Sequence, residues 1–586
     1  MRKNIVLYLF LFASIALGLL LGYQTLATPR VVSIASGELS SERMAGHLET
    51  IAAEYRSVLH IERRMYVRDY IIDNMESHGL EAWVDEFEVS YEDYIRRHLN
   101  RQQERGWPQA TTELWLGYLE EHGYEHFPLI GWNMLFRQQG RSDTAIMLMA
   151  HIDSASLHHV FHPDSDQESL GAADSGYGLA LMLELARYFA GRELENTIYF
   201  FFTDLEEMGL LGAYHAVETM DFSNVAMILN LEARGVRGPV HMFETHAGDF
   251  AAIRFFRDAL AGTNAQPMAY SFAAAIYREM PNATDLTPFL NLGFAGMNFA
   301  PLDSLMYYHT YRDNLDNISL TTMQHYINMI GALTEAFAMD ARFADVNYFA
   351  SEQGGVYFPL PFGIFVLYTD TTAAIIGFAM LAITLAAAFF FKNTFRLCKV
   401  LIWMIIVLLS MLAGAAFGLG ISFVVSLITD VPFNPTFMRN SAEIIIMWPS
   451  VAAAMLLYVL LHKLLVKKFS RNEIAFGAIL LLAVINAALS FILIEATPLT
   501  LVPLLTALIG FLLSQITYIK QSKLLYAACA AIPTLLTIMM FAPIIHTLTL
   551  ALTIGGLAIF VLITILMLAA LPALWLRCDL DENKMV

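Results

Sequence analysis

Long apolar segments dominate residues 361–586 and limit what this part of the chain can form. The region contains only 12 Lys and Arg residues and 8 Asp and Glu residues. An α-helix of about 20 mostly apolar residues spans the hydrocarbon core of a bilayer. Seven segments of suitable length follow, at about 371–391, 400–428, 444–466, 474–494, 501–519, 524–544 and 547–575. We therefore expect residues 371–586 to form an α-helical polytopic membrane domain of seven helices.

Basic residues fall in alternate loops between these segments. The basic loops hold Lys392, Arg396 and Lys399, then Lys467, Lys468 and Arg471, and then Lys520 and Lys523. The loops between them, 430–443, 495–500 and 545–546, contain Arg439 as their one basic residue. Lys and Arg accumulate in the cytoplasmic loops of membrane proteins. The sequence therefore predicts that the basic loops and the C-terminus are cytoplasmic.

A separate apolar run covers residues 5–22, directly after Arg2 and Lys3. It is longer than the apolar region of most signal peptides, so we expect residues 1–29 to be a retained signal-anchor helix. A cleaved signal peptide, with Ala27 as a cleavage position, is the alternative. The two flanking basic residues place the N-terminus in the cytoplasm, and the next domain would then lie outside it.

This predicted extracytoplasmic domain, residues 30–350, differs in composition from the apolar region. Residues 1–360 contain 23 Lys and Arg residues and 46 Asp and Glu residues, a formal charge of −23. Such a surface argues against nucleic-acid binding, which needs clustered basic residues. All three cysteines lie beyond residue 360, so the domain must be stabilised by its own core, for which it is large enough. Residues 351–370 would form a membrane-proximal connector. Short loops and a cysteine-free outer domain favour a prokaryotic plasma membrane, with an endoplasmic reticulum or vacuolar membrane as the alternative.

Apolar strands and amphipathic helices alternate along the middle of this domain. Short apolar runs bounded by polar residues are typical of buried strands, whereas a period of 3.6 residues indicates a helix. The predicted strands are 145–150, 197–203, 225–231 and 295–299, and the predicted helices are 177–190, 213–218 and 250–261. Two further helix patterns lie within residues 41–80. The alternation predicts an α/β fold with helices on both faces of a sheet.

Potential metal ligands follow the predicted strands, where binding sites form in sheets of this type. Asp174 lies in a Gly-Ala-Ala-Asp-Ser-Gly turn that leads into the 177–190 helix. The strands are followed in order by His151 and Asp153, by Glu206 and Glu207, by Glu232 and, after the fourth strand, by Tyr308 and His309. Since the carboxyl ends of parallel strands meet at one edge of a sheet, we expect these side chains to lie close together.

Carboxylate and imidazole ligands without cysteine suit Zn²⁺. Two zinc ions about 3.5–4 Å apart need a bridging carboxylate and terminal ligands on each side. The adjacent Glu206 and Glu207 fit a division in which one binds metal and the other acts as general base on a water. Asp153 is placed to accept the second imidazole N–H of His151. The pattern therefore predicts two-metal hydrolysis.

Five motifs between residues 133 and 315 are similar to those of one peptidase family. They are A-H-I-D-S (150–154), G-A-A-D-S (171–175), D-L-E-E-M-G-L-L-G (204–212), N-L-E-A (230–233) and Y-H-T-Y-R-D (308–313). On these motifs the chain resembles the co-catalytic zinc peptidases of family M28 (clan MH). Three further motifs are similar to a multi-pass branch of this family, which includes the endoplasmic reticulum metallopeptidase and the vacuolar membrane protease. They are P-N-A-T-D-L-T-P-F (281–289), G-M-N-F-A (296–300) and V-Y-F-P-L (356–360).

The resemblance implies a mixed, largely parallel sheet flanked by helices, a zinc-exopeptidase-like sandwich, and a membrane-bound aminopeptidase that uses two Zn²⁺ to cleave peptides. It also implies residue roles: His151 and Glu232 on one zinc, Glu207 and His309 on the other, Asp174 as bridge, Glu206 as general base, Asp153 as the partner of His151, and Tyr308 as a phenol that stabilises the oxyanion. Ser175 and Arg234 depart from the residues usual at their positions, but no ligand is lost.

Two alternatives stay open: a peptidase fold used as a non-catalytic receptor or scaffold, and a glutaminyl-cyclase-like transferase. Ser175 lacks a G-x-S-x-G context and the sequence contains no H-E-x-x-H, which argues against a serine hydrolase and a single-zinc helix site. Asp285 is either a supporting residue of the site or a turn residue, and His158, His159 and His162 are interpreted as surface residues or as a substrate rim. The apolar segments have almost no ionisable residues, which favours an anchor or partner-binding platform over a transporter. The oligomeric state is not predicted.

Overall fold

A computed structural model describes residues 5–33, 38–96, 129–156, 168–280, 282–429, 443–517 and 522–571, with isolated positions at 113, 117, 120, 121, 123, 433–435, 438 and 519. The chain divides into two compact units. The α/β unit comprises residues 26–359 and 363–367, and the helical unit comprises residues 1–25, 360–362 and 368–586. His158, His159 and His162 lie outside the described residues.

The α/β unit is built on a seven-stranded mixed sheet in the order β1-β2-β4-β3-β5-β7-β6. The central strands β4, β3, β5 and β7 are parallel, whereas β1 and β2 at one edge and β6 at the other run antiparallel to their neighbours. The strands are β1 Ala82–Val89, β2 Leu129–Gln138, β3 Ser142–His151, β4 Asn196–Thr203, β5 Val225–Leu231, β6 Arg237–Thr245 and β7 Gly296–Asp303. The expected fold class, a mixed and largely parallel sheet flanked by helices, is confirmed.

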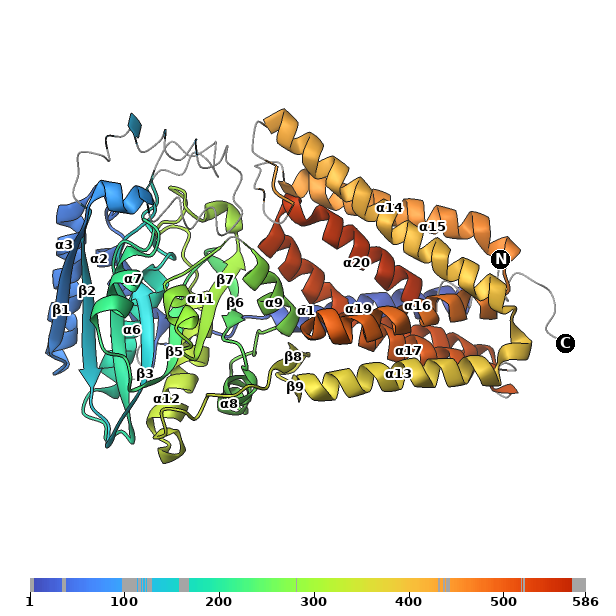
Figure 1. Ribbon diagram of the computed structural model, residues 1–586, viewed down its shortest axis with the longest axis horizontal. Helices are drawn as coiled ribbons and strands as arrows, with labels where there is room; N and C mark the ends of the chain where they lie inside the picture. Colours follow the sequence, from blue (N-terminus) through green and yellow to red (C-terminus); the bar gives the residue numbers. More distant parts are fainter. Residues whose placement is uncertain are drawn as a thin grey trace. The chain divides into compact units, whose positions relative to one another are not determined.

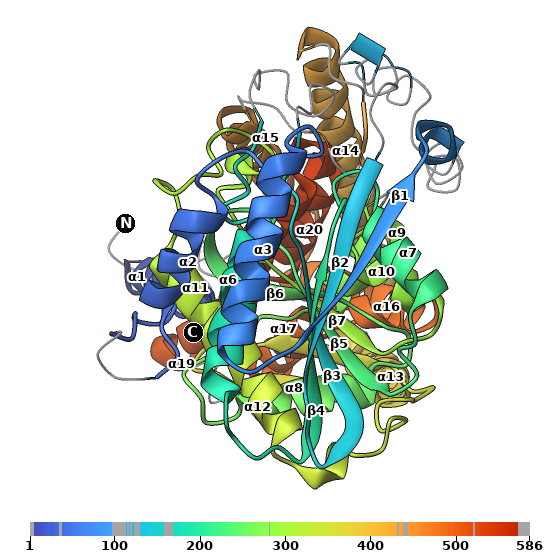
Figure 2. The same ribbon diagram turned by 90° about the vertical axis from the view of Figure 1, so that its left-hand side faces the viewer.

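Helices cover both faces of this sheet because the residues of its central strands alternate between two cores. In β3, Ile146, Leu148 and Ala150 join one buried cluster, whereas Met147 and Met149 join the other. Figure 2 shows α3 and α6 on one side of the strands and α7 and α10 on the other. The first face packs against α2 Ser41–Ile51, α3 Ile61–Ser77, α6 Gly176–Phe189, α8 Phe250–Leu260, α11 Leu320–Tyr326 and α12 Ala332–Ala338, and the second against α7 Leu211–Thr219 and α10 Leu286–Asn291. Burial on both faces explains why these strands are continuously apolar in sequence.

Three smaller elements complete the α/β part of the chain. Helix α9, Ser271–Glu279, packs against β6, and a 3₁₀ turn at Leu305–Tyr307 follows β7. Strands β8, Gly355–Pro359, and β9, Phe365–Thr369, pair as a separate two-stranded sheet, and β9 leads directly into the first helix of the C-terminal region.

The helical unit contains the segments that the sequence predicts to be transmembrane (Figure 1). Its helices are α1 Ile5–Tyr23, α13 Asp370–Phe390, α14 Leu397–Thr429, α15 Glu443–Leu465, α16 Arg471–Ile492, α17 Pro498–Gln515, α19 Lys523–Leu552 and α20 Leu557–Ala570. In the part of the chain that the structure describes, seven helices are long and apolar enough to cross a membrane, and α20 is a shorter apolar helix. The turn between the last two helices lies at 553–556, not at the expected 545–546, because α19 continues through that position.

Helix α1 packs closely against α19 within the helical unit. A Cβ added to Gly18 would lie 2.9 Å from the carbonyl oxygen of Leu535, and one added to Gly22 would lie 2.7 Å from that of Met539. Small residues four positions apart let two membrane helices approach closely. The close contact makes α1 part of the helical bundle.

Candidate metal centre

The residues expected to bind metal converge at the carboxyl edge of the parallel strands. His151 ends β3, Glu206 and Glu207 follow β4, and Glu232 follows β5. Asp174 reaches the same place from the turn before α6, and His309 from the segment after β7. Because the strands are parallel, side chains that are far apart in the sequence meet at one edge.

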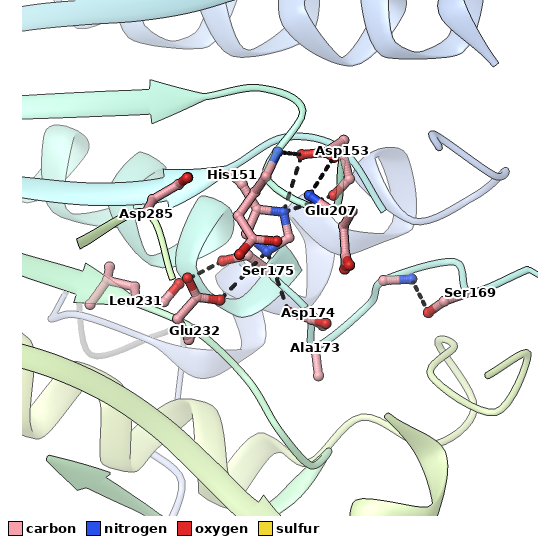
Figure 3. Close-up of polar contacts among 12 residues, drawn as sticks. His151, Asp153, Ser169, Ala173, Asp174, Ser175, Glu207, Leu231, Glu232 and Asp285 are labelled. Atoms are coloured by element: carbon pink, nitrogen blue, oxygen red, sulfur yellow. Dashed lines mark hydrogen bonds and ion pairs between the residues drawn. The ribbon is translucent and has the colours of Figure 1, made fainter. Parts of the chain in front are cut away.

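Asp174 lies between the two histidines. Figure 3 shows its side chain, together with that of Glu232, beside His151. Its Oδ1 atom is 3.4 Å from Nε2 of His151, and its Oδ2 atom is 3.1 Å from Nε2 of His309. Glu232 Oε2 lies 3.6 Å from Nε2 of His151, and Glu207 Oε1 lies 3.1 Å from Nε2 of His309. The atoms form two groups, each with ligand atoms within 4.8 Å of one another, that share the Asp174 carboxylate.

The donor set fits zinc. Each group offers one imidazole nitrogen and carboxylate oxygens, which suit Zn²⁺. Burial raises the pKa of Glu207, and the negative charge of Asp174 adds to the effect although His309 opposes it. Burial alone would lower the pKa of His309, but Glu207 and Asp174 outweigh it and raise that pKa to about 9. A buried site with this excess of negative charge is one that cations would stabilise.

Asp153 orients the candidate metal ligands, but its contacts differ in part from the one expected from the sequence. Nδ1 of His151 lies 3.0 Å from the backbone oxygen of Asp153 and 3.4 Å from its carboxylate. The N–H of this nitrogen donates to Asp153, which leaves Nε2 free to face Asp174. The Asp153 carboxylate instead accepts the backbone N–H groups of Glu206 and Glu207, each at 3.1 Å. One aspartate thus fixes both the imidazole and the loop that carries the two glutamates.

Glu206 lies beside the candidate ligands, in a group with His151 and Glu207 whose potential ligand atoms are within 4.8 Å of one another. Burial raises its pKa well above the usual value, and the charges of Glu232 and Glu207 add to the effect although His151 opposes it. A carboxylate with a raised pKa next to metal ligands is suited to accept and return a proton.

Tyr308 stacks its ring on that of His309, with 3.6 Å between the ring centroids. Burial raises the pKa of its phenol well above the usual value, and Asp174, Glu207 and Glu206 add to the effect, whereas Arg234 opposes it. The hydroxyl therefore keeps its proton at neutral pH and can donate it in a hydrogen bond.

The sequence pattern missed the residues that hold the Asp174 turn in place. The Asp313 carboxylate accepts the backbone N–H groups of Ala173, at 2.7 Å, and of Asp174, at 3.1 Å. The buried Arg56 guanidinium donates to the backbone oxygens of Ile152 and Gly171 and ties this turn to the segment after β3. Asp313 is the last residue of the Y-H-T-Y-R-D motif, so the motif could have pointed to a role for it at the site. Arg56 stands in no motif.

Two other polar side chains singled out in the sequence have structural partners. The Ser175 hydroxyl donates to the backbone oxygen of Leu231, at 2.6 Å, so it joins the Asp174 turn to β5. Asp285, before α10, accepts a hydrogen bond from the Thr203 hydroxyl. Burial raises the pKa of Asp285 to about 8, and the charges of Glu232 and Asp153 add to the effect although His151 opposes it. It is a buried neighbour of the site rather than a simple turn residue.

Residues 133–334 match the family model described as peptidase family M28. These residues form an M28 domain. The match covers β2 to the start of α12 and includes every proposed ligand, and it confirms the family that the motifs indicated.

The M28 domain is also similar to fungal proteins named vacuolar membrane protease. The identity is 28% over 205 residues with that of Candida dubliniensis, covering 33% of this chain and 20% of the relative. The identity with the protein of Vanderwaltozyma polyspora is 26% over 259 residues, which covers 43% of this chain and 25% of that relative. The matched region thus spans about a fifth to a quarter of these relatives. With its long apolar helices, the chain is a multi-pass membrane protein. The fungal relatives give no support to the expected prokaryotic plasma membrane.

Solved structures with a similar chain path include an aminopeptidase from Aneurinibacillus sp. strain AM-1, with 14% identity, a TM-score of 0.39, and coverage of 54% of this chain and 96% of that one. A glutaminyl cyclase from Bacteroides thetaiotaomicron has 16% identity, a TM-score of 0.39, and coverage of 52% and 99%.

Proposed function

We propose that the chain is a membrane-anchored di-zinc aminopeptidase that hydrolyses N-terminal residues of peptides outside the cytoplasm. The position of Asp174 between Nε2 of His151 and Nε2 of His309 carries the proposal. One carboxylate oxygen faces each imidazole, as a ligand shared by two ions requires. Glu232 and Glu207 complete the two groups, so that each ion would have three protein ligands.

When bound, zinc supplies Lewis-acid chemistry, polarising a peptide carbonyl and lowering the pKa of water. The protein would supply the proton transfers. The Glu206 carboxylate accepts the proton of the attacking water and returns it to the leaving amine. The neutral Tyr308 phenol donates a hydrogen bond to the oxyanion that develops on the carbonyl. Asp153 keeps His151 and the backbone of Glu206 and Glu207 in position for these steps.

The connection between the two units supports an extracytoplasmic M28 domain. Helix α13 begins at Asp370, directly after β9, and ends at the basic loop that contains Lys392. If the basic loops are cytoplasmic, the chain that precedes α13 lies on the other side of the membrane. The acidic character of residues 1–360 would attract substrates with a cationic free N-terminus.

Two variants and a chelator test the proposal on the full-length, detergent-solubilised protein. Glu206→Gln should keep zinc and lose at least about 100-fold in turnover, the usual minimum contribution of a general base. Glu193→Gln, at a side chain that is 88% exposed, should retain full activity. The readouts are zinc content and release of one amino acid from a panel of aminoacyl chromogenic substrates, with and without chelator.

The same assay separates the alternatives. Zinc binding without cleavage of any substrate would favour a receptor or scaffold. Release of ammonia from peptides with N-terminal glutamine, without release of an amino acid, would favour a glutaminyl-cyclase-like transferase. Full activity of Glu206→Gln would refute its role as general base.

A further inference from the structure

Two basic turns, far apart in the sequence, meet at one end of the helical unit. The first, residues 391–399, joins α13 to α14, and the second, residues 462–473, runs from the end of α15 into α16. The Lys399 ammonium donates to the backbone oxygen of Lys468, at 2.6 Å, and the Arg396 backbone N–H donates to Glu473, at 3.2 Å. These contacts join the two turns into one surface, which we call the basic face.

The basic face carries a large excess of positive charge. Its cations are Lys392, Arg396, Lys399, Lys463, Lys467, Lys468 and Arg471, and five of these residues, all except Lys399 and Arg471, are exposed. Glu473 is the one acidic residue in the two segments, and it is buried. Its carboxylate accepts the backbone N–H of Ser470 in a capping box at the start of α16. The acid is thus engaged within the protein, and the exposed cations have no acidic side chain from these two segments beside them.

Apolar side chains border these cations. Phe390 is 78% exposed at the end of α13, Leu397 is 60% exposed at the start of α14, and Leu464 is 72% exposed near the end of α15. In a membrane helix such side chains contact lipid chains, and nearby Lys and Arg reach the headgroup level. The Lys392 ammonium lies 4.3 Å from the centre of the Phe389 ring and so stays beside this apolar border.

We propose that the basic face binds the phosphate headgroup of an anionic phospholipid whose acyl chains lie along the apolar border. Clustered basic residues next to a membrane helix attract anionic lipid. Orientation of the chain requires only that basic residues lie in these loops. It does not require that cations from two turns, about 70 residues apart in the sequence, share one surface. A soluble anion would make no use of the apolar border, so a lipid is the occupant that fits both features.

Dioleoylphosphatidylglycerol is the probe, and dioleoylphosphatidylcholine is the zwitterionic comparison. The full-length protein in detergent is titrated with each lipid, and bound lipid is counted by native mass spectrometry. The test variant is Arg396→Gln/Lys467→Gln/Lys468→Gln, which alters exposed side chains and leaves the contact through the Lys468 backbone oxygen in place. Each basic side chain near an anionic surface strengthens binding about fivefold, so loss of three predicts roughly 100-fold weaker binding of phosphatidylglycerol.

Two controls separate charge at this site from folding and from net charge. The charge-preserving variant Arg396→Lys/Lys467→Arg/Lys468→Arg should bind phosphatidylglycerol as wild type does. The variant Arg141→Gln/Arg192→Gln/Arg342→Gln removes the same charge from exposed positions of the α/β unit and should also bind as wild type does.

Three results would overturn the proposal. Wild type could bind both lipids equally, or the test variant could bind phosphatidylglycerol within threefold of wild type. Glycerol 3-phosphate or inorganic phosphate could compete at concentrations equal to those of the lipid, which would identify a free-anion site that does not use the acyl chains.

Discussion

Replacement of Asp313 by alanine should weaken zinc binding although Asp313 contacts no proposed zinc-binding atom. The substitution removes the acceptor of two buried backbone N–H groups, those of Ala173 and Asp174. A buried donor left without a partner costs about 1–3 kcal/mol. Two such donors therefore predict a loss of about 2–6 kcal/mol, part of it as lower overall stability and part as displacement of the Asp174 turn.

Zinc affinity is the measurement that separates a positioning role from a purely structural one. A residue that supports a metal ligand typically changes metal affinity about 10–100-fold. Asp313→Ala should fall in this range when zinc content is measured against a competing chelator of known affinity. Asp313→Asn, which keeps one acceptor oxygen, should give a smaller loss. The exposed Asp316, three residues away, is the matched control, and Asp316→Ala should bind zinc as wild type does.

A positioning role for Asp313 is refuted if Asp313→Ala lowers the melting temperature but binds zinc within threefold of wild type. The hydrogen bonds to Ala173 and Asp174 would then stabilise the turn without determining where the Asp174 carboxylate lies.

Three further predictions concern stability. The ring of the buried His325 accepts a hydrogen bond from the backbone N–H of Val240, and burial lowers its pKa from 6.5 to about 4. Between pH 6.5 and 4 the unfolded chain therefore binds more protons than the folded chain, so the free energy of unfolding decreases as the pH is lowered through this range. The full loss is about 3 kcal/mol, and the melting temperature of His325→Gln should fall less than that of wild type over this range. Arg64→Met removes the guanidinium that lies 2.5 Å from the buried Asp204 carboxylate. Thermal unfolding should then show a free energy of unfolding lower by about 3–5 kcal/mol. Unchanged unfolding of this variant would contradict the importance of the pair. Gly18→Leu should lower thermal stability by separating α1 from α19, whereas Gly420→Leu, with no atom within 4 Å of an added Cβ, should have little effect. If the first helix is retained, the mass of the purified protein should include α1.

The central strands of the sheet were predictable because both of their faces are buried. Strand β5 has the predicted bounds, and β3, β4 and β7 differ from theirs by only a few residues. The antiparallel strands were not predicted. Strand β1 lies at the edge of the sheet, and five of its residues are acidic or exposed, so it lacks a continuous buried apolar run. Strand β6 contains a glycine and a proline. Edge position and turn residues thus hide a strand from a pattern based on hydrophobicity.

The convergence of the candidate ligands could be predicted from the sequence because each follows a recognisable strand or turn. The place of Arg56 could not be predicted, because it binds backbone groups, which carry no residue-specific pattern. Arg56 precedes α3 and donates to backbone oxygens more than 90 residues away. Asp153 shows the same limit, since its carboxylate binds the N–H groups of Glu206 and Glu207 rather than chiefly the imidazole that the sequence suggested. The roles of Glu206, Tyr308 and the five ligands remain predictions for the experiments above.

The pairing of α1 with α19 sets an order of events during synthesis. Gly18 and its partner Leu535 are separated by more than 500 residues. At about 5–20 residues per second, the ribosome needs roughly 25–100 s to make the intervening chain. If α1 is a retained anchor, its glycine face therefore stays uncovered while the whole M28 domain and five membrane helices are made. A chain that stops before α19 cannot form this pairing, so α1 and α19 come together late in synthesis.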